Sequence, residues 1–375
     1  MFPEILYIQA IIIYSFRSII FFIGLITEYK KRIIKTKSDK ILSVSIVVPA
    51  RNEEDNIESC IESIMSNNYP KDNFEVIVVN DRSTDKTGEI LVNLQSIYSN
   101  LIVLKITDNT KHKNLRGKPG ALQVGIESAK GEIIMMTDAD CIVNENWIES
   151  VSKPFLDENV GLTAAVTNIK PSNGFEIAQA VYWVYMHTMA CAGIGINQPL
   201  GCFGNNLSVR KSDFVQLGGF ENIKFSMTED LALQQAVFNN NRKIRYLISD
   251  DSSVETLPCK TFKEYLKQQH RWALGGLDLG WRAAIFVISS IALWIGLITS
   301  LIFCELAWFF AILFTRFVFD FILIFSSLKR LNKLKLSIWI IPSAVVFILM
   351  ELFVPFLLLD RETVWKGQVF KKEKT

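Results

Sequence analysis

Carboxylate, amide and guanidinium side chains recur in four short motifs whose order along the chain is informative. The motifs are a strand ending at Asp81, TDAD (Thr137–Asp140), TED (Thr228–Asp230) and QQHRW (Gln268–Trp272). A membrane-length apolar region follows the last motif at once. Each motif alone is common by chance, but the ordered set indicates that all four contribute to one site beside a membrane.

The TDAD motif predicts a metal site. It follows the apolar strand EIIMM, so Asp138 and Asp140 leave the sheet edge with one residue between them and can turn toward the same ligand. Hard divalent cations prefer carboxylate oxygens, and Mg²⁺ shares its coordination shell with phosphate and water. Such a cation would neutralise a leaving diphosphate. An ordinary turn is the alternative explanation of this motif.

The TED motif predicts a general base. Glu229 and Asp230 open the helical pattern TEDLALQQAVF, where Thr228 is placed to cap the helix. A hydroxyl nucleophile must lose its proton as it attacks, and a carboxylate at a helix start beside a metal is suited to accept it. We assign this role to Asp230, with Glu229 beside it. Alternatively, both acids merely complement the positive end of the helix.

The first strand ends in VVPARNEEDN, which places Pro49, Arg51 and Glu53 at the carboxyl edge of a parallel sheet, where open α/β folds bind ligands. This turn lacks the GxGxxG pattern of dinucleotide-binding folds, which argues against a hydride-transfer enzyme. Asp81 ends the next strand at the same edge. Binding is the predicted role of Asp81, and a turn or helix cap is its alternative.

The QQHRW motif lies on an amphipathic run that directly precedes the apolar region. Arg271 offers a planar fork for phosphate oxygens, Trp272 a flat face for a sugar or an acceptor, and Gln268 an amide. The alternative is an interfacial tryptophan with a snorkelling arginine, which is common near membranes.

Two further segments are candidates for ligand contacts, and a third is not. Lys118 lies between glycines before a helix in RGKPGAL, where it would contact a pyrophosphate or a base. The loop Gly201–Arg210, rich in glycine and amides, would line an acceptor pocket. The stripe Ala180–Met189 is predicted to be a packing or interfacial helix rather than a binding element.

Between Ser43 and about Thr261 the pattern is that of an α/β domain. The apolar runs SVSIVVP, FEVIVVN, LIVLKI and GEIIMMTD alternate with helical stretches such as 56–66 and 87–96. Strands that alternate with helices predict a largely parallel sheet.

Apolar segments on both sides of this domain predict transmembrane helices at Ile5–Thr27, Ala283–Phe303, Glu305–Ser326 and Ser337–Leu359. The basic run that follows the first segment places its C-terminal side in the cytoplasm. Arg17 lies within that segment and should face other helices or snorkel. A basic patch at 329–335 and a basic tail after 365 both favour the cytoplasm, yet one segment separates them. Either one of these two basic segments does not lie in the cytoplasm, or Pro342 and Pro355 mark a re-entrant or interfacial segment.

The composition excludes several classes of protein. Half of the 375 residues are hydrophobic, as in a membrane protein. The 40 Lys and Arg nearly balance the 38 Asp and Glu, so no basic field indicates a nucleic-acid partner. Six scattered cysteines and three histidines make a zinc site or a disulfide framework improbable.

Taken together, the motifs resemble those of membrane-integrated family 2 glycosyltransferases. This inverting GT-A group includes processive synthases of cellulose, chitin, hyaluronan and poly-N-acetylglucosamine, and also lipid glycosyltransferases. The resemblance covers about Ser43 to Trp272. It implies a GT-A nucleotide-sugar-binding domain of the α/β class, with a mostly parallel central sheet and flanking transmembrane helices. It also implies a bacterial plasma-membrane protein whose catalytic domain is cytoplasmic.

The resemblance further implies the ligands. The donor would be a nucleotide-diphosphate sugar, often UDP-linked, and the acceptor a lipid or a saccharide. Asp138 and Asp140 would hold Mg²⁺ or Mn²⁺ with the diphosphate, and Asp230 would be the base. Three residues of the last motif would close over the donor diphosphate and the acceptor end: Gln268, Arg271 and Trp272. The base and ribose of the donor would lie near Pro49, Arg51, Glu53, Asp81 and Lys118.

Two departures from the family pattern keep alternatives open. The membrane part is small for a polymer-secreting synthase, although QxxRW favours processivity, and Gln368 replaces the arginine of a WKGR motif found in some relatives. A processive polysaccharide synthase and a non-catalytic sugar-nucleotide-binding subunit are therefore the competing functions. The predicted divisions are a transmembrane helix at 1–28, the GT-A domain at 29–281, about three spans at 282–360 and a basic tail at 361–375.

Overall fold

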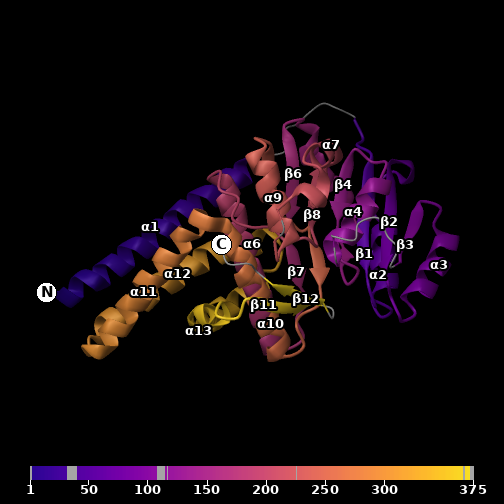
Figure 1. Cartoon of the computed structure of the whole chain (residues 1–375). Helices are drawn as coiled ribbons and strands as arrows, with labels where there is room; N and C mark the ends of the chain where they lie inside the picture. Colours follow the sequence, from indigo (N-terminus) through magenta and orange to yellow (C-terminus); the bar gives the residue numbers. More distant parts are fainter. Residues whose placement is uncertain are drawn as a thin grey trace.

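The computed structural model describes residues 2–31, 40–107, 115, 117–224, 226–365 and 368–371. An α/β unit stands at one end of a bundle of long helices (Figure 1). Arg116, His112, half of the basic residues of the run after the first helix and residues 366–367, which directly precede Gln368, lie outside the described residues.

The central sheet has seven strands in the order β3-β2-β1-β4-β8-β6-β9. Strands β1 to β4 pair in parallel, β8 is antiparallel to both of its neighbours, and β6 and β9 pair in parallel. The mostly parallel sheet predicted from the sequence is confirmed. The strands are β1 (Val44–Ala50), β2 (Phe74–Asp81), β3 (Leu101–Ile106), β4 (Ile133–Met136), β6 (Val160–Ala165), β8 (Leu207–Arg210) and β9 (Lys243–Leu247).

The strands β1, β2 and β4 are mostly apolar and almost fully buried, as expected of strands covered by helices on both faces of the sheet. In the β1–β2 register, Ala50 lies opposite Asn80, so the residues that follow the two strands emerge together. Helix α4 packs so closely on β1 that a Cβ at Gly125 would clash with the side chain of Val47. These contacts fix the edge at which the sequence places ligand-binding residues.

Shorter elements complete the α/β unit. A second sheet consists of β5 (Ile142–Val143), β10 (Val254–Thr256) and β7 (Thr167–Ile169), in that order. The helices are α2 (Ile57–Met65), α3 (Thr87–Ile97), α4 (Lys118–Ser128), α5 (Trp147–Ser152), α6 (Gly174–Gly195), α7 (Lys211–Gln216), α8 (Gly219–Asn222), α9 (Glu229–Asn239) and α10 (Phe262–Gly276). Short 3₁₀ segments cover Lys71–Asn73, Lys153–Leu156, Leu277–Ala283 and Leu334–Trp339.

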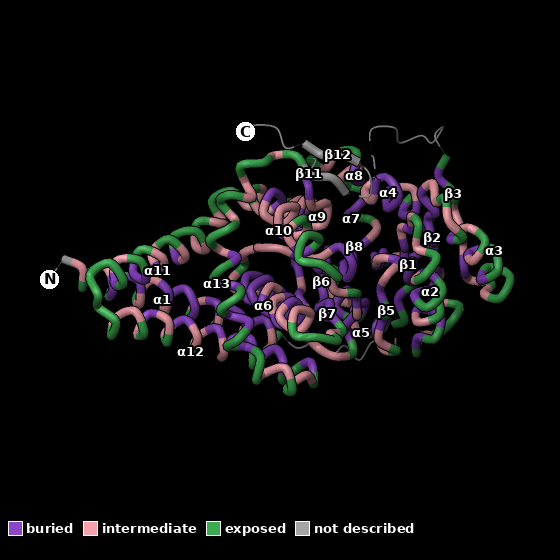
Figure 2. Tube along the Cα trace, turned by 90° about the horizontal axis from the view of Figure 1, so that it is seen from below, coloured by how far each residue is buried: buried purple, intermediate pink, exposed green. Residues whose placement is uncertain are grey.

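Four helices of the described chain contain stretches long and apolar enough to cross a membrane, and they coincide with the segments predicted from the sequence. They are α1 (Phe2–Lys30), α11 (Ala284–Ile302), α12 (Leu306–Arg330) and α13 (Ile340–Leu357). Exposed residues run along the outer side of this bundle (Figure 2), and many of them are isoleucine, leucine and phenylalanine. A hairpin of β11 (Glu362–Trp365) and β12 (Gln368–Lys371) follows α13.

The hydrophobic core passes without a break from the α/β unit into the bundle. One cluster of buried side chains contains Leu25 of α1, Met189 of α6 and Leu323 of α12 together with residues of the sheet. Helices α1 and α6 touch at glycines, because a Cβ on Gly24 would clash with the backbone of Ala192. The division of the chain at residues 28 and 281 stays a prediction from sequence.

Arg17 faces other helices, as its position within an apolar segment predicts. Its side chain is 3% exposed and lies 3.8 Å from the carboxylate of Asp320 on α12. Its guanidinium also covers the ring of Tyr14 at 4.1 Å. Burial against a carboxylate and a ring lets a charged group remain inside the bundle.

Candidate active site

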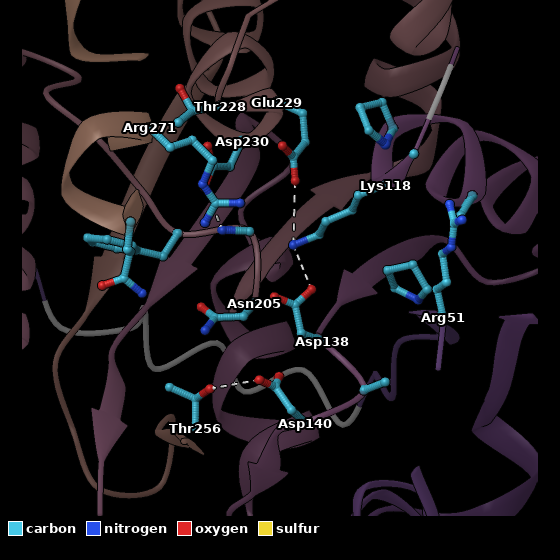
Figure 3. A pocket seen from close by; sticks show the side chains of 18 of the residues that line it. Arg51, Lys118, Asp138, Asp140, Asn205, Thr228, Glu229, Asp230, Thr256 and Arg271 are labelled. Carbon is cyan, nitrogen blue, oxygen red and sulfur yellow. Dashed lines mark hydrogen bonds and ion pairs between the residues drawn. The ribbon is translucent and has the colours of Figure 1, made fainter. Parts of the chain in front are cut away.

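All the site residues named from the sequence line one cavity of about 270 Å³. The cavity lies at the carboxyl edge of β1, β2 and β4, between the sheet and helices α4, α9 and α10 (Figure 3). Parallel strands present their carboxyl ends at one edge, which explains why motifs far apart in sequence meet. The residues are Pro49, Arg51, Glu53, Asp81, Lys118, Asp138, Asp140, Glu229, Asp230, Gln268, Arg271 and Trp272.

The turn after β1 is held by the segment that follows β2. The backbone N–H of Glu53 donates to Thr87 Oγ1 at 2.8 Å, and that of Asn52 donates to Ser83 Oγ at 3.1 Å. Asp81, at the end of β2, pairs with the neighbouring Arg82 at 2.7 Å. Two strand ends therefore form one wall of the cavity.

Lys118 bridges two of the acidic motifs. As the first residue of α4, it places Nζ 2.6 Å from Asp138 Oδ1 and 3.4 Å from Glu229 Oε1 (Figure 3). Burial disfavours its charge, but the two carboxylates outweigh burial and raise the pKa of Lys118 above its usual value. A cation is thus fixed at the centre of the cavity.

Asp140 turns away from Lys118 toward β10. One carboxylate oxygen lies 3.5 Å from Thr256 Oγ1, which donates to it. Burial first, and then the charges of Asp138 and Glu53, raise the pKa of Asp140 to about 6. The site therefore concentrates more negative charge than Lys118 neutralises.

This donor set fits a hard divalent cation that completes its shell from a ligand. Asp138 and Asp140 supply two carboxylates from one short loop, and their mutual repulsion is the kind of charge that a cation relieves. The described residues contain no group of three or more His, Cys, Asp or Glu side chains arranged around one point. Oxygens of a diphosphate and water would have to supply the other positions.

Asp230 is held by two backbone donors at the start of α9. The N–H of Gly204 donates to Oδ2 and the N–H of Leu231 to Oδ1, both at 2.7 Å. Burial and the adjacent Glu229 raise the pKa of Asp230 to about 6, against the lowering effect of Lys118. A fixed carboxylate that exchanges a proton near neutral pH is suited to general-base chemistry.

The far wall of the cavity is aromatic. Trp272 on α10 makes edge-to-face contacts with Trp183 of α6 and with Phe203, at ring-centroid distances of 5.3 and 5.4 Å. Trp183 and Phe203 stack at 5.2 Å. Gln268 and Arg271 lie on the same helix as Trp272, so α10 presents an amide, a cation and a ring to the cavity.

Comparison with known proteins assigns the family. The sequence profile of glycosyl transferase family 21 matches residues 12–374. The chain belongs to glycosyl transferase family 21. The predicted resemblance to glycosyltransferases is confirmed at this level, whereas the narrower assignment to family 2 is not.

Several curated relatives of this family 21 chain are glycosyltransferases. A probable glycosyltransferase of Bacillus subtilis, YdaM, is 29% identical over 305 residues, which are 76% of this chain and 64% of the relative. A β-monoglucosyldiacylglycerol synthase of a Nostoc species is 30% identical over 240 residues, 62% of this chain and 48% of the relative. This chain therefore spans less than two thirds of the length of each of these relatives.

The fold also occurs in a solved glycosyltransferase. The mannosyltransferase PcManGT of Pyrobaculum calidifontis superposes with a TM-score of 0.55 at 18% identity, over 92% of this chain and 99% of that one. The predicted GT-A architecture with flanking apolar helices is confirmed as a fold.

Sequence reasoning missed part of the cavity of the family 21 chain. Trp183 lies in the stripe predicted only to pack, yet it lines the cavity, and Thr256 and Leu257 close the side next to Asp140. The loop Gly201–Arg210 contributes Phe203, Gly204 and Asn205, as expected. The helical period of the stripe indicated a buried face but not what that face touches.

Two polar atoms of this wall have no hydrogen-bond partner among the described residues. They are the indole Nε1 of Trp183, whose side chain is 5% exposed, and Oε1 of Gln268. Buried polar atoms are normally paired, and both residues line the cavity, so a bound ligand is a candidate partner for each atom.

His187, close to the same wall, has a structural role. Its Nε2 accepts from the N–H of Thr167 at 3.1 Å, and its Nδ1 pairs with the hydroxyl of Tyr246 at 2.7 Å. Both ring nitrogens are therefore used, and burial lowers the pKa of His187 to about 3. The ring stays neutral and holds α6 against the sheet.

Proposed function

We propose that this chain is a membrane-bound inverting glycosyltransferase. It would move a sugar from a nucleotide-diphosphate sugar to a hydroxyl of a lipid or saccharide acceptor. The observation that carries the proposal is that a fixed carboxylate with a pKa of about 6, two further carboxylates and the cations Lys118 and Arg271 share one cavity. A non-catalytic binding subunit would not need Asp230 as a proton acceptor.

The donor end of the cavity lies at β1 and β2. Pro49, Arg51, Glu53 and Asp81 would contact the base and ribose, as the edge of an open α/β sheet binds nucleotides. Lys118 and Arg271 would then meet the phosphates. The arginine fork supplies two parallel hydrogen bonds and the lysine a compact point charge.

Asp138 and Asp140 would hold Mg²⁺ or Mn²⁺, which would supply positive charge at the departing diphosphate. The structure of PcManGT was determined with GDP-mannose and Mn²⁺, which supports a metal-dependent donor site. Lys118 sits against Asp138 at 2.6 Å, so this ammonium contributes to the same charge balance.

The acceptor hydroxyl would attack the anomeric carbon from the side opposite the diphosphate. The new C–O bond forms as the bond from the anomeric carbon to the phosphate oxygen breaks, and the configuration inverts. The hydroxyl proton passes to the carboxylate of Asp230. Gly204 and Leu231 hold both carboxylate oxygens and so orient the base for this transfer.

The aromatic wall would bind the acceptor. Trp183, Phe203 and Trp272 offer flat apolar surfaces to a sugar ring or to the carbons next to the reacting hydroxyl. The N–H of Trp183 and the amide oxygen of Gln268 would bond to its polar groups. The name of the Nostoc relative, a glucosyldiacylglycerol synthase, supports a lipid acceptor.

The membrane assignment rests on the apolar helices, and the cytoplasmic placement rests on charge. Basic residues stand at the ends of α1 and α12 that adjoin the α/β unit, including Lys30, Lys31, Lys329 and Arg330. Basic residues at helix ends favour the cytoplasmic side. The cavity would therefore face the cytoplasm.

The test is donor turnover by the purified full chain with a panel of nucleotide sugars, with Mn²⁺ or with chelator. We expect metal-dependent release of nucleoside diphosphate and transfer to added lipid or saccharide; product size separates single addition from processive synthesis. Asp230→Asn should lower turnover by about 10² to 10⁴-fold with donor affinity nearly unchanged, because it removes only the proton acceptor. The control is Asp251→Asn, an exposed carboxylate that does not line the cavity. A loss confined to donor affinity would make Asp230 a binding residue and contradict the mechanism.

A further inference from the structure

Helix α13 has the length and composition of a transmembrane helix, but both of its ends lie on the side of the α/β unit. We propose that α13 lies along the bilayer surface on that side, with membrane lipids covering its exposed face, and that only α1, α11 and α12 cross. This inference rests on the proposed membrane association but not on the chemistry of the cavity.

The segment before α13 is anchored to the walls of the cavity. Lys333 Nζ lies 3.1 Å from Glu255 Oε1 of β10, next to the cavity residue Thr256. Leu336 packs against the cluster that contains Trp183 and borders Trp272. The start of α13 is therefore fixed beside the active site.

The segment after α13 returns to the same region. The carbonyl of Asp360 accepts a hydrogen bond from His270 Nε2 at 2.8 Å. His270 lies on α10, the helix that presents Gln268, Arg271 and Trp272, and β11 lies against α10 as well. The end of α13 is thus also held by the helix that carries the QQHRW motif.

Helix length makes these two anchors incompatible with a crossing. The 18 residues of α13 span about 27 Å at about 1.5 Å per residue, close to the roughly 30 Å hydrocarbon thickness. A crossing helix would carry Asp360 to the opposite membrane surface. In Figure 1, α1, α11 and α12 run together away from the sheet, whereas α13 stays beside α10.

The far end of the crossing bundle is defined by the α11–α12 turn. Trp308, just after this turn, contacts the ring of Tyr7 near the start of α1 at 5.6 Å. Cys304 lies in the turn and is exposed. The beginning of α1 and Cys304 therefore mark the membrane side opposite to the cavity.

The two faces of α13 match an interfacial position. On its inner face, Phe347 contacts Tyr182 of α6 at 5.0 Å, and Glu351 forms two hydrogen bonds with Arg316 of α12 at 2.6 and 2.9 Å. The outer face continues the exposed apolar surface of the bundle. It consists of Ile341, Val345, Leu349, Phe353 and Phe356, which recur every three or four residues.

The residues that precede α13 are those that anchor a helix in an interface. Trp339 and Lys335 are exposed directly before it, and aromatic and basic side chains favour the headgroup layer. An interfacial α13 also removes the conflict between the basic patch at 329–335 and the basic residues after 365. Both then lie on one side of the membrane.

Cysteine labelling in sealed membrane vesicles of opposite orientation tests the proposal. In a background with Cys259→Ser and Cys304→Ser, the other four native cysteines are buried. Leu359→Cys, at a position that is 80% exposed, and Glu362→Cys report the end of α13. The reference for the cavity side is Ile97→Cys on α3, and native Cys304, in its own Cys259→Ser background, is the reference for the opposite side. The probe is a membrane-impermeant maleimide.

We expect Leu359→Cys and Glu362→Cys to label in the same vesicles as Ile97→Cys, and Cys304 only in vesicles of the other orientation. Labelling of either test position together with Cys304 would overturn the proposal. If the bilayer shields Leu359→Cys from both sides, the side on which Glu362→Cys labels decides. Labelling of both references in the same orientation would instead show that the bundle does not cross, and would contradict the membrane part of the proposed function.

Discussion

Lys118 is the residue on which the charges of the cavity converge. It contacts the TDAD motif through Asp138 and the TED motif through Glu229, so the two acidic motifs are electrically linked. Because it stays protonated, it lowers the pKa values of both Asp140 and Asp230, against burial and the neighbouring carboxylates. The proton affinity of Asp230, the proposed base, therefore depends on Glu229 of its own motif and on Lys118 of α4.

Substitution of Glu229 should move the pH profile. In the proposed mechanism Asp230 accepts a proton only when deprotonated, so activity should be present above its pKa of about 6 and should be lost as the pH falls through that value. Glu229→Gln removes a negative neighbour that raises this pKa, so the acidic limb of kcat/KM should move to lower pH. The measurement is the pH dependence of kcat/KM with saturating Mn²⁺.

Glu53→Gln is the matched control for this shift. Glu53 raises the pKa of Asp140 but is not among the charges that act on Asp230. A bound cation would in any case keep Asp140 ionised. If the acidic limb of kcat/KM moved in Glu53→Gln and not in Glu229→Gln, the group that titrates would be Asp140 and not Asp230.

Trp183→Phe should impair acceptor binding selectively. It keeps a ring in the aromatic wall but removes the N–H that has no partner among the described residues. One neutral hydrogen bond contributes about 0.5 to 1.5 kcal/mol, so the KM for acceptor should rise about 2- to 12-fold while donor hydrolysis is unchanged. Trp147→Phe is the control, because its Nε1 bonds internally to Asn206 at 2.9 Å. That variant should lose stability and keep its acceptor KM.

Among the elements, α6 links the cavity to the bundle. In the middle of the helix, Trp183 is part of the aromatic wall and His187 contacts the sheet. In its last turns, Ala192 and Gly195 pack against α1. Helix α6 therefore makes contacts both with α1 and with the aromatic wall of the cavity.

Gly24→Ala should destabilise the protein. The added Cβ would clash with the backbone of Ala192, which cannot rotate away as a side chain can. Overpacking of this kind costs about 1 to 3 kcal/mol, measurable as a lower unfolding temperature in detergent. Gly174→Ala at the start of α6, where a Cβ meets nothing within 4 Å, should leave this temperature unchanged.

The elements that could be predicted are those determined by local pattern. Strands β1 to β4 are rich in apolar residues and were all found near the predicted residues. The antiparallel insertion of β8 between β4 and β6 depends on pairing between distant segments, which carries no local signal. That the twelve residues named from the sequence line one cavity follows in part from position, because most of them lie at strand ends or helix starts, whereas Gln268, Arg271 and Trp272 lie within α10. Trp183 could not be predicted, because helical periodicity shows burial without showing the neighbour.

At the scale of the whole molecule, a polar cluster joins the apolar helices. Arg316 is 2% exposed and bonds to Glu351, while Asp320 accepts from the hydroxyl of Tyr14 at 2.6 Å and approaches Arg17. The positive charges of the two arginines balance the negative charges of the two carboxylates, so this cluster has no net charge. Such a set stabilises one arrangement of helices over others because no charge can be left behind without cost.

Removal of one member of the Arg316–Glu351 pair should therefore lower the free energy of unfolding more than removal of both members. Arg316→Met leaves Glu351 without its counter-charge and should lower the free energy of unfolding by about 3 kcal/mol. The double variant with Glu351→Leu restores neutrality and should recover most of that loss. Thermal unfolding of the wild type, both single variants and the double variant measures the coupling between α12 and α13. Additive losses would show that the pair is not coupled.

The shared core of α1, α6 and α12 has a practical consequence for anyone who wishes to crystallise the catalytic part by itself. A recombinant fragment that starts after residue 30 would lack Phe21 and Leu25, both fully buried, and would leave the glycine-lined surface of α6 open to solvent. We expect such a fragment to aggregate or to need detergent even though it contains every residue of the cavity. Expression trials should accordingly retain the first helix, and solubilisation should be optimised for the intact chain.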